Sequence, residues 1–114
     1  MGRAIATLFP IQWREPFGLV TIESMAAGTP VIAMGLGAVP EILAHGYNGF
    51  ICNNIAECIA AVSQVPSISR AACREYVEQN FGVDSMANGY EAVYQAVLSE
   101  KFSCNGYRKM QIAA

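Results

Sequence analysis

The chain has 114 residues, 54% of them hydrophobic and 14% charged, with a formal net charge of -2. These values are typical of one compact domain with an apolar core and exclude a disordered segment. The charge is too small to indicate a surface for nucleic acid or an anionic membrane, and no apolar stretch approaches the roughly 20 residues of a membrane span. Pro10 and the polar residues after it interrupt the first apolar run too early for a secretory signal.

The first half of the chain alternates short apolar runs with helical patterns. The expected strands are 5–9, 31–34 and 49–52. The expected helices between them are 18–27, with Gly28 as its stop, and 40–44. In the first helix, Leu19, Ile22 and Ala26 form the expected core stripe. This order predicts parallel βαβ units and an α/β fold with a partial Rossmann-like sheet of about three strands.

The second half is predicted to be helical. The expected helices are 55–65, 69–81 with Ser69 as N-cap, and one capped by Asp84 that runs to about residue 100. The apolar stripes are Ile55, Cys58, Ile59 and Val62 in the first helix, and Met86, Tyr90, Val93, Tyr94 and Val97 in the last. Residues 103–114 lose the pattern, so we predict a domain over 1–102 and a loose tail over 103–114.

The first strand, 5–9, is apolar enough to expect neighbours on both sides. We therefore expect that its free edge is covered by a missing part of a larger protein or by a second subunit.

The four cysteines, Cys52, Cys58, Cys73 and Cys104, form no C-x-x-C pair, and His45 stands at ligand spacing to none of them. We therefore predict structural thiols rather than disulfides, and no metal site. Unpaired cysteines are typical of a reducing cytoplasm, which is the expected location.

Two carboxylates flank the start of the helix expected at 18–27. Glu15 lies in the loop before it, and Glu23 is the only charged residue between Pro16 and Pro40. A loop at the carboxyl end of a strand and the N-H groups of a helix start form the usual ligand site of an open α/β sheet. Carboxylates repel phosphate but accept hydrogen bonds from hydroxyl groups, so this pattern favours a nucleotide-sugar. The alternative is that Glu23 faces solvent or has a local hydrogen-bond partner.

Residues 15–23, EPFGLVTIE, resemble the E-x(7)-E motif of retaining, GT-B-fold glycosyltransferases of family 4. The resemblance continues through SMAAGTPVIA at 24–33, GAVPE at 37–41 and GYNGFI at 46–51, and it covers about residues 5–100. It implies that the chain is the C-terminal, donor-binding part of such an enzyme. Ser24 stands where the family has alanine, a change that we expect to leave the site undisturbed.

The resemblance also implies roles for individual residues. Glu15 would be the catalytic residue in contact with the transferred sugar, and Glu23 would hold the ribose hydroxyls. The backbone of Phe17, Gly18, Leu19 and Val20 would approach the sugar and the diphosphate of a UDP-, GDP- or ADP-sugar. No cofactor or metal is implied. The family's cations for the diphosphate lie upstream of this region, so the chain alone is expected to be inactive.

Other residues near these motifs are interpreted more simply. His45 is expected to be a surface turn residue, and Arg14 a loop charge. Gly35 and Gly37 are expected to serve turns more than ligands. Trp13 either covers part of the site or packs on its loop.

Three functions remain open at this level. The favoured one is a fragment of a hexosyltransferase that moves a sugar from a nucleotide-diphosphate donor to an acceptor with retention. The alternatives are a non-catalytic nucleotide-sugar-binding module and a structural fragment that assembles through its free strand edge.

Overall fold

The structure, a computed structural model, describes the backbone of residues 1–112 and the side chains of residues 1–99. The chain forms two units, Met1–Phe81 and a second that begins at Gly82, each described here by itself. This division falls before the boundary at residue 102 that the sequence analysis predicts. No described helix combines the length and the apolar character that a membrane span requires.

The first unit is built on a parallel sheet of three strands in the order β1-β2-β3. The strands are β1 (Thr7–Phe9), β2 (Val31–Met34) and β3 (Gly49–Cys52). The predicted α/β fold is therefore confirmed, and the bounds of β2 and β3 are as expected. Strand β1 begins two residues later than predicted, because pairing with β2 starts at Thr7 and Ile5 is exposed.

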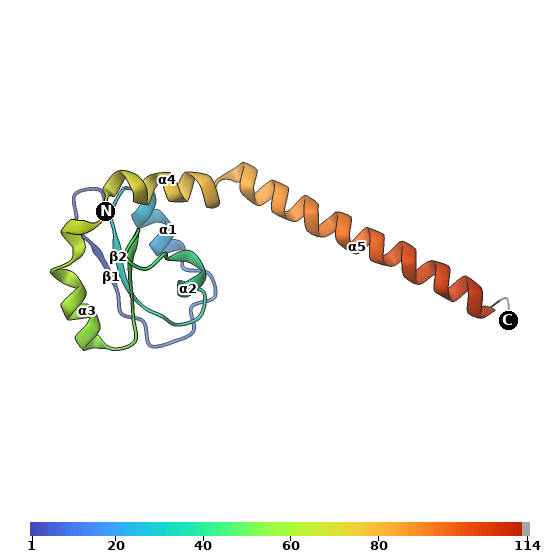
Figure 1. Cartoon of the computed structure of the whole chain (residues 1–114), viewed down its shortest axis with the longest axis horizontal. Helices are drawn as coiled ribbons and strands as arrows, with labels where there is room; N and C mark the ends of the chain where they lie inside the picture. The colour runs from blue at the N-terminus through green and yellow to red at the C-terminus, as the bar shows by residue number, and fades with distance from the viewer. Residues whose placement is uncertain (113–114) are drawn as a thin grey trace. The chain divides into compact units, whose positions relative to one another are not determined.

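Helices cover the two faces of this sheet differently. The first unit contains α1 (Leu19–Ala26), α2 (Val39–Ile42), α3 (Ile55–Val62), a short 3-10 helix (Val65–Ser67) and α4 (Arg70–Asn80). Figure 1 shows α3 on one side of the strands and α1 on the other, where α4 packs against α1. Helix α3 ends earlier than predicted, since Pro66 fits a new 3-10 turn but not an α-helix interior. Helix α2 begins and ends before the predicted 40–44.

Side chains cap two of these helices. The Ser69 hydroxyl accepts a hydrogen bond from the Ala72 N-H at 3.3 Å, which confirms the predicted N-cap of α4. The Asn54 side chain likewise accepts from the Glu57 N-H at 2.9 Å at the start of α3. Each cap satisfies one of the free N-H groups of a helix start.

The predicted core stripe of α1 is confirmed in part, since Ile22 and Ala26 are partly buried against the core but Leu19 is not. Leu19 is 61% exposed, and the buried face carries Thr21, Ser24 and Met25. Small polar side chains let α1 approach its neighbours closely, and their hydroxyl groups are hydrogen-bonded within the chain. The Thr21 hydroxyl donates to the Gly18 carbonyl at 2.6 Å, and the Ser24 hydroxyl donates to the Thr29 carbonyl at 2.9 Å. These hydroxyl groups can be buried because their hydrogen bonds offset the cost of removing them from water.

The second unit consists of α5 (Val83–Ile112) in its described part. Asp84 lies inside the first turn, so it is not the N-cap that the sequence analysis predicts. The helix also runs through residues 103–112, where a loose tail is predicted. Backbone hydrogen bonds can continue a helix after its apolar period ends, which explains the difference. The predicted apolar positions, from Met86 to Val97, are exposed.

Cys52, Cys58 and Cys73 are free and buried, as predicted; the side chain of Cys104 lies outside the described residues. Burial raises the pKa of the Cys52 thiol from 9.0 to about 11, with smaller contributions from the neighbouring Cys58 and Glu57. Burial also raises the pKa of Cys73. The Cys52 and Cys73 thiols are therefore neutral packing groups rather than reactive thiolates.

Candidate functional site

The loop after β1 holds the Glu15 carboxylate at the start of α1. Its Oε1 accepts a hydrogen bond from the Gly18 N-H at 3.0 Å, and its Oε2 accepts one from the Trp13 indole N-H at 3.1 Å. Both donors come from the same loop, so the carboxylate has a fixed place although it is only half-buried. Each oxygen keeps a lone pair for a further donor.

The loop after β2 fixes the backbone of Glu15. The Ala38 N-H donates to the Glu15 carbonyl at 2.8 Å, and Gly37 forms a parallel bridge with Glu15. Gly37 has φ 64°, and a Cβ added there would overlap the backbone N and O of Glu15. The expected structural role of Gly37 is thus confirmed. It lets two loops meet at the carboxyl end of the sheet, the edge where ligands bind in such folds.

Free backbone donors lie next to this carboxylate. Gly18, with φ 83°, precedes α1 in a left-handed conformation. Its N-H is taken by Glu15, whereas the N-H groups of Leu19 and Val20 have no partner among the described residues. The first N-H groups of an α-helix lack partners within the helix and attract anions. The site thus offers two amide donors beside one positioned carboxylate.

The remaining predicted site residues are accessible to solvent. Phe17, Leu19 and Val20 expose large apolar side chains. Glu23 lies further along α1 and is exposed, and its carboxylate makes no hydrogen bond with any described residue. The structure therefore joins Glu15 and Gly18 directly and leaves Glu23 free on the same helix. Neither carboxylate lines the two cavities that border α3.

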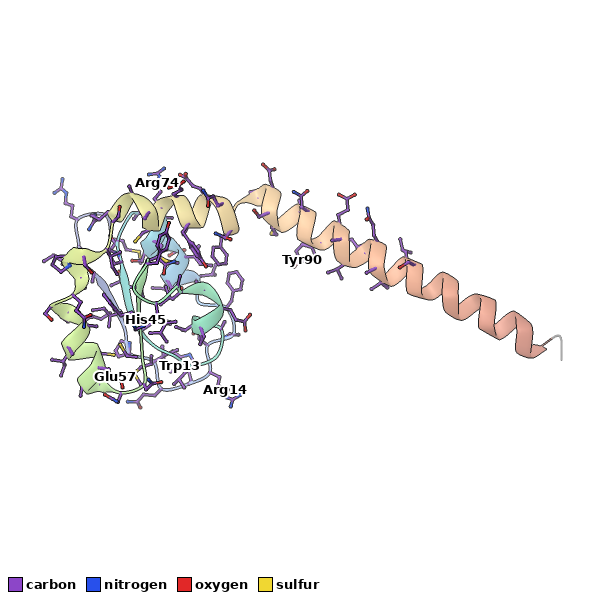
Figure 2. All side chains as sticks on the ribbon, viewed as in Figure 1. Trp13, Arg14, His45, Glu57, Arg74 and Tyr90 are labelled. Atoms are coloured by element: carbon purple, nitrogen blue, oxygen red, sulfur yellow. The ribbon has the colours of Figure 1, made fainter. Side chains whose placement is uncertain are left out.

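The hydrogen bond from Trp13 to Glu15 is a contact that the sequence analysis left open. Figure 2 labels Trp13 and Arg14, neighbours on the loop that follows β1. The only signal in the sequence is an indole donor two residues before a carboxylate, a spacing compatible with a contact inside one loop. Trp13 is itself largely exposed, so it supports Glu15 while keeping a free apolar surface.

His45 and Gly35 have structural roles. The His45 Nδ1 accepts a hydrogen bond from the Ile51 N-H at 3.1 Å, and the His45 and Phe50 rings pack in a T-shape with 5.7 Å between their centroids. The interpretation as a turn residue is consistent with these contacts. A Cβ on Gly35 would lie 2.8 Å from the Ile51 side chain, so this glycine serves close packing of the strands.

Comparison with known proteins identifies the family of this chain. Residues 1–79 match the family Glycosyl transferases group 1. The chain is 35% identical over 105 residues to a D-inositol 3-phosphate glycosyltransferase of Streptomyces avermitilis, covering 84% of this chain and 22% of the relative. It is 33% identical over 104 residues to a glycogen synthase of Mycobacterium tuberculosis, covering 84% and 25%. An N-acetyl-alpha-D-glucosaminyl L-malate synthase of Bacillus anthracis is 30% identical over 95 residues, covering 76% and 25%.

The chain spans about a quarter of the length of these relatives. The family match covers most of the first unit, including the sheet, α1 and the whole candidate site. The chain therefore belongs to the glycosyl transferases group 1 family.

Proposed function

We propose that this chain forms part of the donor site of a glycosyltransferase that uses a nucleotide-diphosphate-sugar, a UDP-, GDP- or ADP-sugar. The observation that supports this most is that the Glu15 carboxylate is held at the start of α1 by the Gly18 N-H, while the next two N-H groups, of Leu19 and Val20, are free. The names of the relatives, which include glycosyltransferases and a glycogen synthase, agree with sugar transfer. We also propose that the reaction transfers a hexosyl group with retention, as the resemblance to family 4 implies.

The diphosphate would bind at the amide donors. The N-H groups of Leu19 and Val20 carry the partial positive charge of the helix start, which stabilises an anion. A phosphate placed against the Glu15 carboxylate would be repelled. The amide donors and the Glu15 carboxylate would therefore bind different parts of one ligand.

Glu15 would bind the sugar. A carboxylate that already accepts hydrogen bonds from Gly18 and Trp13 is held in one orientation, and its remaining lone pairs can accept from sugar hydroxyls. The Gly18 backbone has no side chain in the way of the sugar ring. We assign Glu15 the catalytic role, because a rigid acceptor next to the reacting sugar fixes its orientation.

Glu23 would bind the ribose. Its carboxylate is exposed and has no partner among the described residues, so two vicinal hydroxyls can both donate to it. It follows the amide donors along α1, as the ribose follows the diphosphate in the donor. The exposed side chains of Phe17 and Val20 would contact the apolar faces of the ligand.

We further propose that the isolated chain binds donor without turnover. The leaving diphosphate needs cations to neutralise it, and Arg14 is the only basic residue within the loop that forms this site. The free, buried thiols agree with the reducing conditions of the cytoplasm, which we propose as the location.

Calorimetry tests the proposal. The chain is titrated with UDP, GDP and ADP and with their glucose conjugates. We expect one nucleotide to bind, and its sugar conjugate to bind more tightly. Glu23→Gln should weaken both ligands about tenfold, whereas Glu15→Gln should remove the gain from the sugar, effects of about 1–2 kcal/mol for lost charged hydrogen bonds.

Glu75→Gln is the matched control. It removes one exposed carboxylate from α4, outside the site, and should leave the affinities unchanged. If none of the nucleotides or conjugates binds at millimolar concentration, the chain has no donor site of its own and the proposal fails.

A further inference from the structure

Three sulfur-bearing side chains meet between the sheet and α3. Met34 is the last residue of β2, Cys52 is the last residue of β3, and Cys58 lies in α3. The Cys58 thiol donates to the Met34 Sδ, with 3.9 Å between the two sulfur atoms. The Cys52 thiol lies within hydrogen-bonding distance of the Cys58 sulfur. The fold therefore gathers two thiols and one thioether from three different elements.

This cluster differs from what the spacing of the cysteines predicts. The sequence analysis expects no metal site, because no two cysteines form a C-x-x-C pair. In the structure, Met34 and Cys52 are paired in register on β2 and β3. Register partners on neighbouring strands direct their side chains to the same face of the sheet, and α3 packs against both of these strands. Tertiary contacts thus bring together sulfur atoms that are far apart in the sequence.

The two thiols are buried but are not sealed off. Cys52 is 2% exposed and Cys58 is 9% exposed. Within the apolar stripe predicted for α3, Cys58 is the buried member, whereas Ile55, Ile59 and Val62 are exposed. Cys52 borders a cavity of about 160 Å³, and Cys58 borders another of about 210 Å³. The sulfur atoms are therefore shielded from bulk water and remain accessible to a small ion.

The nitrogen and oxygen ligands next to Cys52 already have partners. The cavity beside Cys52 is also lined by Glu57 and His45, which Figure 2 labels. The Glu57 carboxylate accepts a hydrogen bond from the Asn53 N-H at 2.8 Å, and the His45 Nδ1 accepts one from the Ile51 N-H at 3.1 Å. Among the described residues, no three His, Cys, Asp or Glu side chains are grouped so that they could hold a metal ion. A metal at the two thiols therefore depends on the thioether as its third ligand.

We propose that Met34, Cys52 and Cys58 bind one Cu(I) ion. Thiolate and thioether ligands are soft and select Cu(I), whereas zinc sites use thiolates, imidazoles and carboxylates. Three sulfur ligands in a plane, each about 2.3 Å from the ion as in zinc thiolates, lie about 4 Å from one another. The 3.9 Å between the Cys58 and Met34 sulfur atoms agrees with this arrangement.

Binding exchanges protons for the ion without electron transfer. The two neutral thiols release their protons to water, and a lone pair of each sulfur forms a bond to Cu(I), which stays in the same oxidation state. The ion then ties the ends of β2 and β3 to α3 and stabilises the folded chain, because a bound metal contributes its binding free energy to folding. This site depends on neither donor binding nor sugar transfer.

Competition with the Cu(I) chelator bicinchoninate tests the proposal, without oxygen and with ascorbate as the reductant. Every form carries Cys104→Ser, which removes the thiol whose side chain lies outside the described residues. The chain should take one Cu(I) ion from the chelator, and Cys52→Ala and Cys58→Ala should each abolish this competition. Met34→Leu should weaken binding by at least about tenfold, since even an outer-shell partner of a metal contributes this much. Leucine replaces methionine with little change in volume, so this variant keeps the fold.

Cys73→Ala is the matched control. Cys73 is also a buried thiol, but it lies in α4 and donates to the Asn48 carbonyl at 3.6 Å, outside the cluster. Its replacement should leave the Cu(I) affinity unchanged. X-ray absorption at the copper edge should show three sulfur neighbours at about 2.3 Å.

Four results would overturn the proposal. These are a chain that takes no Cu(I) from the chelator, Met34→Leu that binds as tightly as the unaltered chain, Cys73→Ala that loses as much affinity as Cys52→Ala, and copper with nitrogen or oxygen neighbours. None of these measurements includes a nucleotide, so a failed donor site would leave the result intact.

Discussion

The two faces of the sheet differ in how far the chain completes them. On the α1 face, small polar side chains are buried and paired, and even the edge strand has a hydrogen-bonded neighbour in Ser24. On the α3 face, the side chains are larger and apolar, yet Leu8 and Ile59 lie open. The apolar content of a sheet face therefore does not by itself predict whether that face is buried in the described chain. The face that α1 covers is completed by hydrogen bonds between α1 and its neighbours, whereas the other face is left open over β1 in the described part of the chain.

The largest expected effect concerns the contact between the two loops at the site. Gly37→Ala would force a Cβ into the Glu15 backbone and should destabilise the fold by about 4 kcal/mol or more. Gly46→Ala is the control, because Gly46 also has a positive φ, 79°, but its Cβ would meet nothing within 4 Å. It should cost about 1 kcal/mol. Urea unfolding measures both; equal losses would mean that the loop contact does not hold Glu15.

Ile32 and Leu8 are paired in register on β2 and β1, and they allow a buried and an exposed position on the same face of the sheet to be compared. Ile32→Ala should lower the free energy of unfolding by about 3 kcal/mol, as is usual for a buried aliphatic side chain. Leu8→Ala should change it by less than about 0.5 kcal/mol, because surface substitutions have small effects. Denaturant unfolding of both variants of the isolated chain is the measurement. A large loss for Leu8→Ala would show that β1 is covered within this chain.

Ser24 tests the paired hydroxyls on the α1 face. Ser24→Ala removes the bonds to the Thr7 hydroxyl and the Thr29 carbonyl, and should cost about 2 kcal/mol because it leaves buried polar groups unpaired. The exposed Ser63 bonds only the Ala60 carbonyl one turn back, so Ser63→Ala should change stability by less than about 0.5 kcal/mol. Thermal unfolding compares them. If Ser24→Ala were as stable as the parent chain, the α1 face would owe little to these bonds.

The smallest expected effect is a dependence on pH from the closed part of the α3 face. The pKa of Cys52 is about 11 in the folded chain and near 9.0 when unfolded. Above pH 9 the unfolded chain releases this proton and the folded chain keeps it, so stability falls as the pH rises towards 11. Between pH 8 and pH 10 the parent chain should lose about 1 kcal/mol more than Cys52→Ala. Unfolding at both pH values measures this; identical losses would contradict it.

Much of the fold could be predicted because its signals are local. The runs at 31–34 and 49–52 are apolar and bounded by turn residues, and Ser69 stands where an N-cap belongs, so these elements match the structure. The buried face of α1 could not be predicted from hydrophobic period. Thr21 and Ser24 are buried by their hydrogen bonds and small size, and these depend on what α1 packs against.

The site shows a similar limit. The positions of Glu15 and Glu23 around a helix start can be read from the sequence, but the partners of Glu15 cannot. The hydrogen bond from Trp13 depends on the path of the loop, and the support from Gly37 depends on a second loop more than twenty residues away. Local spacing predicts where a carboxylate stands in the chain, whereas tertiary contacts fix where it points.

The most direct test of the donor site follows two backbone amides. The chain is labelled with ¹⁵N, and the amide resonances of Leu19 and Val20 are recorded during titration with UDP, GDP and ADP. One of these nucleotides should shift both resonances strongly, with much smaller shifts at the amides of α4 residues outside the site, such as Glu75. If no nucleotide moves the Leu19 and Val20 resonances, or if it shifts only amides outside α1, the start of this helix does not bind the donor diphosphate.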